Sequence, residues 1–90
     1  MCRNIKTLFN FDPPATHDEI RAAAIQFTRK LSGTTRPSKA NQQAFDQAID
    51  DFTAVATELL GNLVTQAPPK NRETEAQKAR ERAAKRFATQ

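Results

Sequence analysis

The stretch AFDQAIDDFTAVATELLGNLV, residues 44–64, carries the longest apolar stripe of the chain and decides the fold. Apolar residues recur there at steps of three and four, which places them on one broad face of an α-helix. The stripe consists of Phe45, Ala48, Ile49, Phe52, Val55, Ala56, Leu59, Leu60 and Leu63. No other segment offers a comparable apolar surface, so we expect the remaining elements to pack against this helix.

The sequence on either side of the stripe contains clear helix boundaries. Thr16 and Glu19 have the spacing of a capping box, which predicts a helix over about 17–31 that ends at Ser32-Gly33. Ser38 is the expected N-cap of the long helix, over about 39–65. A proline-containing break at residues 67–69 precedes Asn71, which is suited to cap a last helix.

These boundaries predict an all-α protein of a single small domain. We expect an antiparallel two-helix hairpin, because a short loop joins two amphipathic helices. A short N-terminal helical turn over about 4–10 packs on the hairpin and completes a body at residues 1–69. Residues 70–90 form a basic C-terminal helix that is loosely attached, because Phe87 is its only large apolar residue.

The net charge of +4 lies entirely in that C-terminal region. Residues 1–69 hold seven Lys/Arg and seven Asp/Glu, whereas residues 70–90 hold seven Lys/Arg and three Glu. A cationic helix can contact phosphates without sequence specificity. Salt-dependent nucleic-acid binding is therefore an alternative function, through Arg72, Lys78, Arg80, Arg82, Lys85 and Arg86. Glutamates at helical spacing also make a simple solvated charged helix a sufficient explanation.

A second group of polar residues surrounds the loop between the two long helices. Its members are Arg29, Lys30, Arg36, Ser38, Lys39 and Asn41. Such a basic end could meet an acidic protein partner or a phosphate. It could equally be solvated charge balanced by the acidic long helix.

Chemistry-bearing residues are few. Cys2 is the one nucleophile and supports a thiol-dependent enzyme or redox sensor as a further alternative, although a small buried hydrophobe explains it as well. His17 lies beside Asp18 and Glu19, but consecutive positions diverge around a helix. We therefore expect a non-enzymatic protein with no metal and no cofactor. The single cysteine and the absence of a signal or membrane-spanning segment favour the cytoplasm, with no membrane partner.

Several motifs give the chain a family resemblance. The segments MCRNIKTL (1–8), FDPPAT (11–16), EIRAAA (19–24) and PSKAN (37–41) resemble bacterial proteins grouped as domain of unknown function 2277. This resemblance implies a bacterial source. The layout of a Pro-x-Ala-Thr entry, a basic helix, a loop and a long apolar helix also resembles J-domains. Their His-Pro-Asp loop, which engages the seventy-kilodalton heat-shock chaperone, reads Arg36-Pro37-Ser38 here.

We therefore expect a protein-interaction module of J-domain-like layout, which binds an unidentified protein partner through the first helix and the loop at 36–41. Leftover apolar positions such as Leu60 and Val64 leave both a monomer and a homodimer open.

Overall fold

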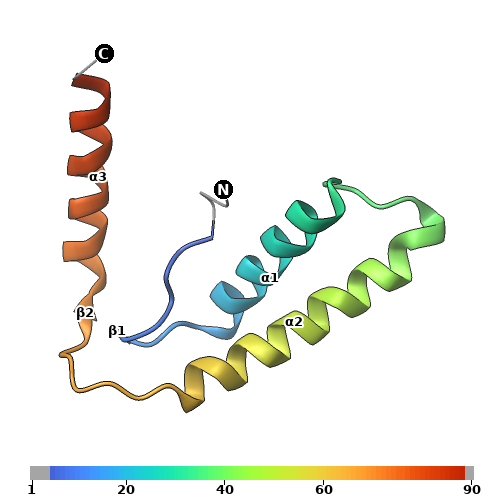
Figure 1. Ribbon diagram of the computed structural model, residues 1–90, viewed down its shortest axis with the longest axis horizontal. Coiled ribbons are helices and arrows are strands. Elements are labelled where there is room, and N and C mark those ends of the chain that lie inside the picture. The colour runs from blue at the N-terminus through green and yellow to red at the C-terminus, as the bar shows by residue number, and fades with distance from the viewer. Residues whose placement is uncertain (1–4, 89–90) are drawn as a thin grey trace.

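The computed structural model describes residues 5–88, with side chains through residue 86, and is mostly helical (Figure 1). The three α-helices are α1 (His17–Ser32), α2 (Gln42–Asn62) and α3 (Arg72–Ala88), and a 3-10 turn, η1 (Lys39–Asn41), leads into α2. Two strands of two residues each, β1 (Phe11–Asp12) and β2 (Lys70–Asn71), pair in parallel. None of the helices within residues 5–88 has the length and apolarity needed to cross a membrane.

Both ends of α1 form the caps that the sequence predicts. The Glu19 backbone N–H donates to Thr16 Oγ1 at 3.2 Å, and Glu19 Oε1 accepts from the Thr16 backbone N–H at 2.9 Å. Together these bonds satisfy two donors that a helix start leaves without partners. At the other end Gly33 adopts φ 73°, and its N–H donates to the Arg29 carbonyl at 2.9 Å. The chain therefore leaves α1 through a left-handed cap that favours glycine.

The helices α1 and α2 form a hairpin-like pair around a very small core (Figure 1). Ile20 and Ala24 of α1 and Ile49 of α2 are the buried apolar residues of the described chain. Thr28 and Thr53 are buried as well, and their hydroxyls donate to the carbonyls one turn earlier in their own helices, at 2.8 and 2.6 Å. Because those hydroxyls are satisfied, they carry no burial penalty that the core would have to offset.

The segment before α1 is not the helix that we predicted over about 4–10. Residues 5–10 contain no helix, and the chain reaches β1 through Asn10, which has φ 65°. The Asn10 side chain donates to the Ala67 and Pro68 carbonyls, and the Lys70 N–H donates to the Asn10 carbonyl at 2.7 Å. A helix this short is unfavourable by itself, and here the backbone finds distant partners instead. The peptide bond between Asp12 and Pro13 is cis.

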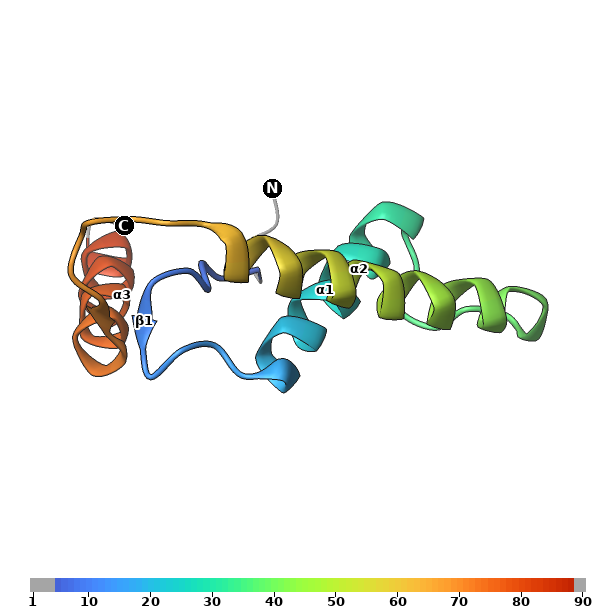
Figure 2. The ribbon, with the colours of Figure 1, turned by 90° about the horizontal axis from the view of Figure 1, so that it is seen from below.

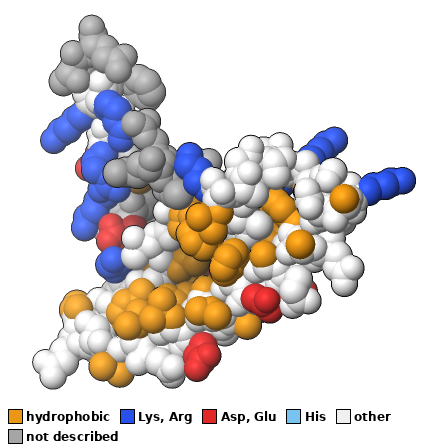
Figure 3. Space-filling model, turned by 45° about the vertical axis from the view of Figure 1, so that its right-hand side comes forward, with side chains coloured by type: hydrophobic (Ala, Val, Ile, Leu, Met, Phe, Trp, Pro, Cys, Tyr) orange, Lys and Arg blue, Asp and Glu red, His pale blue; other side chains and the backbone are white. Residues whose placement is uncertain are grey.

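The apolar stripe of α2 is less buried than the sequence predicts. The helix ends at Asn62, and Val55, Leu59 and Leu63 are 65%, 54% and 44% exposed. The reason is that α1 covers only one side of α2. Figure 3 shows hydrophobic side chains gathered on one face of the molecule, with acidic side chains at its edge.

The third helix projects away from the hairpin (Figures 1 and 2). Within the described residues α3 makes no extensive contact with α1 or α2. The radius of gyration is 15.9 Å, whereas a compact chain of this length would have about 12 Å. The molecule is therefore an open slab of 44 × 39 × 17 Å with one projecting arm.

Candidate functional site

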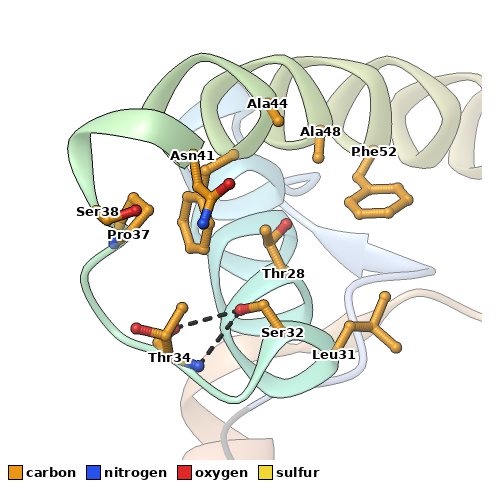
Figure 4. A pocket seen from close by; sticks show the side chains of 11 residues that line it. Thr28, Leu31, Ser32, Thr34, Pro37, Ser38, Asn41, Ala44, Ala48 and Phe52 are labelled. Atoms are coloured by element: carbon orange, nitrogen blue, oxygen red, sulfur yellow. Dashed lines mark hydrogen bonds between the residues drawn. The ribbon is translucent and has the colours of Figure 1, made fainter.

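An open groove of about 590 Å³ lies where α1, the connecting loop and α2 meet (Figure 4). Its walls are mostly apolar and come from all three segments. The lining residues are Thr28, Leu31, Ser32, Thr34, Pro37, Ser38, Asn41, Ala44, Phe45, Ala48 and Phe52. Small residues on α2 create the hollow, because Ala44 and Ala48 leave room between the larger side chains. A concave apolar surface with a few polar groups is the usual form of a binding site.

The aromatic side of the groove is held by a ring contact between the two helices. The rings of Phe27 and Phe52 meet edge to face, with centroids 5.0 Å apart and an interplanar angle of 73°. This geometry is favourable for aromatic pairs and fixes the Phe52 side chain. Leu31, one turn beyond Phe27 on α1, remains 66% exposed at the mouth of the groove. The groove therefore offers apolar contact area that the described chain does not use.

The loop end of the groove is shaped by its own hydrogen bonds. The Thr34 N–H donates to Ser32 Oγ at 3.4 Å (Figure 4), and Thr34 Oγ1 donates to the Arg36 carbonyl at 2.9 Å. These short-range bonds hold the turn that brings Pro37 and Ser38 over the groove.

Of the six polar residues that we predicted as partner-binding, two line this groove, and the four cations lie on the elements that form it. Ser38 and Asn41 line it, and neither side chain makes a capping hydrogen bond at η1 or α2, although we expected Ser38 to cap the long helix. The exposed cations Arg29 and Lys30 lie in the last turn of α1, Arg36 in the loop and Lys39 in η1. Figure 3 shows Lys and Arg side chains protruding at the end of the molecule opposite α3. None of these four cations forms an ion pair with the described part of the chain. Their role in binding a partner stays a prediction.

Arg72, one of the six cations that we predicted to contact nucleic acid, has its partner in a distant part of the sequence. Arg72 makes a bidentate ion pair with Glu19, with Nη1 to Oε2 at 2.8 Å and Nη2 to Oε1 at 2.9 Å. Its guanidinium also donates to the carbonyls of Pro13 and Pro14 at 2.9 and 3.1 Å. Arg72 therefore attaches the start of α3 to the start of α1, in the forked geometry that arginine favours.

This ion pair changes the titration of Glu19. The hydrogen bonds from Arg72, together with the bond from the Thr16 backbone N–H, lower the pKa of Glu19 from 4.5 to about 2. The same pair raises the pKa of Arg72 above its ordinary value. Phe11 of β1 adds to the attachment, because Lys70 Nζ lies 5.5 Å and Arg72 Cζ 5.8 Å from its ring centroid.

The remaining cations of the C-terminal set lie along α3. Lys78 is 3.8 Å from Glu75, and Arg80 donates to the Gln77 side chain at 2.7 Å. Arg82, Lys85 and Arg86 have exposed side chains farther along the helix. Asn71 caps α3 as the sequence predicts, since its Oδ1 accepts from the Thr74 N–H at 2.9 Å. Whether α3 binds nucleic acid stays a prediction.

The other chemical candidates do not meet at the groove. Cys2 lies outside the described residues, so its role as a nucleophile or redox sensor stays a prediction. His17 lines a separate hollow of about 480 Å³ with Asp50 and Glu58, where Arg21 pairs with Asp50 at 3.0 Å. Among residues 5–88 no three His, Cys, Asp or Glu side chains gather as a metal site would require.

Fold and groove together define a small helical-hairpin protein with an open apolar groove at one end and a charged arm at the other. The chain belongs to the family described as "Uncharacterized conserved protein (DUF2277)", whose family model matches residues 1–78. The match covers the whole groove and ends inside α3, and it confirms the family resemblance read from the sequence. Neither the comparison with curated proteins nor that with solved structures finds a match.

Proposed function

We propose that this protein is a non-enzymatic interaction module of J-domain-like layout, whose groove binds a short segment of a partner protein. The proposal rests on an apolar groove whose elements also carry four exposed cations that make no ion pair with the described part of the chain. Phe52, Phe45 and Leu31 supply apolar contacts, and the cations select the charge of the ligand.

The chemistry of the rim favours a segment that combines apolar and acidic side chains. Carboxylates would meet Arg29, Lys30, Arg36 and Lys39 without displacing any existing ion pair of the described chain. The Asn41 amide and the Ser38 hydroxyl would be available to the backbone of that segment. Because the loop lacks the His and Asp of His-Pro-Asp, the proposal does not include stimulation of a chaperone.

Fluorescence anisotropy with two matched peptides tests this function. The first probe is a fluorescein-labelled 12-residue peptide of alternating Leu/Phe and Glu, and in the second Lys replaces every Glu. We expect the acidic peptide to bind and the basic peptide to bind at least tenfold more weakly. The Arg36→Glu substitution should lower the affinity for the acidic peptide by a similar factor.

Two further variants distinguish binding in the groove from a non-specific effect of the net charge. Ala44→Trp places a bulky side chain in the groove and should abolish binding, whereas Lys85→Glu makes the same charge change as Arg36→Glu on α3 and should leave binding unchanged. Equal weakening by Arg36→Glu and Lys85→Glu would contradict the groove as the site. Binding of the basic peptide as tightly as the acidic one would contradict the predicted ligand.

A further inference from the structure

The C-terminal half of α2 carries an apolar stripe that nothing in the described chain covers. Val55 and Leu59 lie one turn apart on the same side of the helix, and Leu63 follows at the same spacing as its C-cap residue; all three are about half exposed or more. The stripe lies beyond the groove, because none of these residues lines it.

The charges beside the stripe argue against its pairing with the same stripe of another molecule. Asp51 lies one turn before Val55, and Glu58 lies next to Leu59. The whole of α2 contains four carboxylates and no Lys or Arg. Packing two such helices together would bring like charges close without a compensating cation, which is unfavourable. The partner of this stripe should therefore be a cationic surface.

The helix α3 has the complementary character. Ala76, Ala79 and Ala83 recur at steps of three and four, so one side of α3 is small, apolar and able to approach another helix closely. Arg80 lies one turn from Ala76 and borders that side, and α3 as a whole carries six Lys/Arg against three Glu. The helix stands clear of its own α2 within the described residues.

We propose that α3 of a second copy of this chain packs on the Val55–Leu63 stripe of α2, in a two-fold dimer. In such a dimer each molecule supplies α3 to its partner and receives the partner's α3, so both stripes are covered by one symmetric arrangement. Charge complementarity between an anionic α2 and a cationic α3 selects this pairing over α2 against α2. The inference goes beyond the proposed function, because it uses neither the groove nor its rim.

Directed disulfide formation tests which helices meet. In a Cys2→Ser background, chains with Leu59→Cys are mixed with chains with Ala79→Cys and oxidised; both positions are exposed, so the fold tolerates the changes. We expect a cross-linked heterodimer at a yield at least tenfold above that of Leu59→Cys alone, because a disulfide requires Cα atoms within about 7 Å. Cross-linking of Leu59→Cys to itself at an equal yield would show α2 against α2 and overturn the proposal.

Size-exclusion chromatography with light scattering on the full chain, treated with nuclease, supplies the second measurement. We expect twice the monomer mass for the unaltered chain and for Val64→Glu, whose position is 92% exposed and off the stripe. Leu59→Glu should give the monomer mass. A monomer for the unaltered chain would overturn the proposal, as would a raised mass that nuclease treatment removes, since α3 would then bind nucleic acid.

Discussion

Glu19 is the residue on which two separate parts of the structure depend. Its backbone N–H and one carboxylate oxygen complete the capping box of α1 with Thr16, and both carboxylate oxygens bind Arg72 at the start of α3. The sequence separation between Glu19 and Arg72 is 53 residues. One carboxylate therefore starts one helix and fixes the attachment of another.

This double use predicts an acid-dependent loss of stability. Because the folded-state pKa of Glu19 is lowered from 4.5 to about 2, its contribution is complete above pH 4.5 and is lost as the pH falls towards 2. We expect Glu19→Gln to lower the free energy of unfolding above pH 4.5, and the difference from the unaltered chain to vanish near pH 2. Urea unfolding followed by circular dichroism at a series of pH values measures this difference.

The matched control for that experiment is Glu58→Gln, measured in dilute protein so that the proposed dimer does not form. The Glu58 side chain is exposed and makes no hydrogen bond or ion pair with the described part of the chain. The free energy of unfolding of Glu58→Gln should therefore differ little from that of the unaltered chain over the same pH range. A Glu19→Gln difference that is independent of pH would show that the carboxylate charge does not contribute to the attachment of α3.

A second prediction at this scale concerns the small core. Ile49 is 5% exposed, so Ile49→Ala should lower the free energy of unfolding by about 2–4 kcal/mol through lost burial and a cavity. Val55→Ala removes apolar volume from the same helix at an exposed position and should change the stability by about 0.5 kcal/mol or less. Urea unfolding of dilute protein measures both, and equal losses would contradict the observed burial.

At the scale of elements, the two glycines predict opposite effects of the same substitution. Gly33 ends α1 with φ 73°, whereas Gly61 lies within α2, and an added Cβ would meet nothing within 4 Å at either position. The backbone conformation at each glycine therefore decides how the substitution changes the stability. Gly33→Ala should destabilise the protein by about 1 kcal/mol, because left-handed backbone is unfavourable for alanine. Gly61→Ala should stabilise it by about 0.5 kcal/mol, because alanine favours the helix.

Thermal unfolding of the two variants beside the unaltered chain measures both effects. Gly33→Asn serves as the control, since asparagine tolerates left-handed backbone better than alanine and should lose less stability. A loss for Gly61→Ala as large as that for Gly33→Ala would mean that contacts absent from the described chain surround α2 there.

Elements whose causes are local could be predicted from the sequence. The capping box of Thr16 and Glu19, the Gly33 cap and the Asn71 cap each depend on residues within a few positions, and the structure contains all three. Of the residues that line the groove, the sequence singles out the polar residues Ser38 and Asn41. The sequence predicts that the apolar walls of the groove belong to the core. Periodicity shows that a helix face is apolar, but it does not show whether another element covers that face.

Elements whose causes are distant could not be predicted. Asn10 bonds to residues 57 and 58 positions away, and these bonds replace the expected N-terminal helix with an extended segment and β1. The Arg72 attachment likewise appears in the sequence only as one cation among several. No local pattern marks it, because its partner Glu19 lies 53 residues away in the sequence.

At the scale of the whole molecule, the proposed dimer predicts a concentration-dependent melting temperature. Association stabilises the folded state by mass action, by about 2.7 kcal/mol at a hundredfold excess over the dissociation constant. For a chain of this size that corresponds to a rise in Tm of roughly 10–20 °C. Differential scanning fluorimetry over a dilution series should show this rise for the unaltered chain and for Val64→Glu, and a constant Tm for Leu59→Glu.

The slab is 17 Å along its shortest axis, roughly one and a half times the diameter of a single helix with its side chains. A layer so thin has a very small interior, and Phe27 and Phe52 pack between the helices while Phe27 stays 40% exposed and Phe52 lines the groove. A molecule that covered the exposed apolar face would enlarge this core. If the proposed partner binds there, it should slow hydrogen exchange in α1 and α2 even where it touches neither backbone.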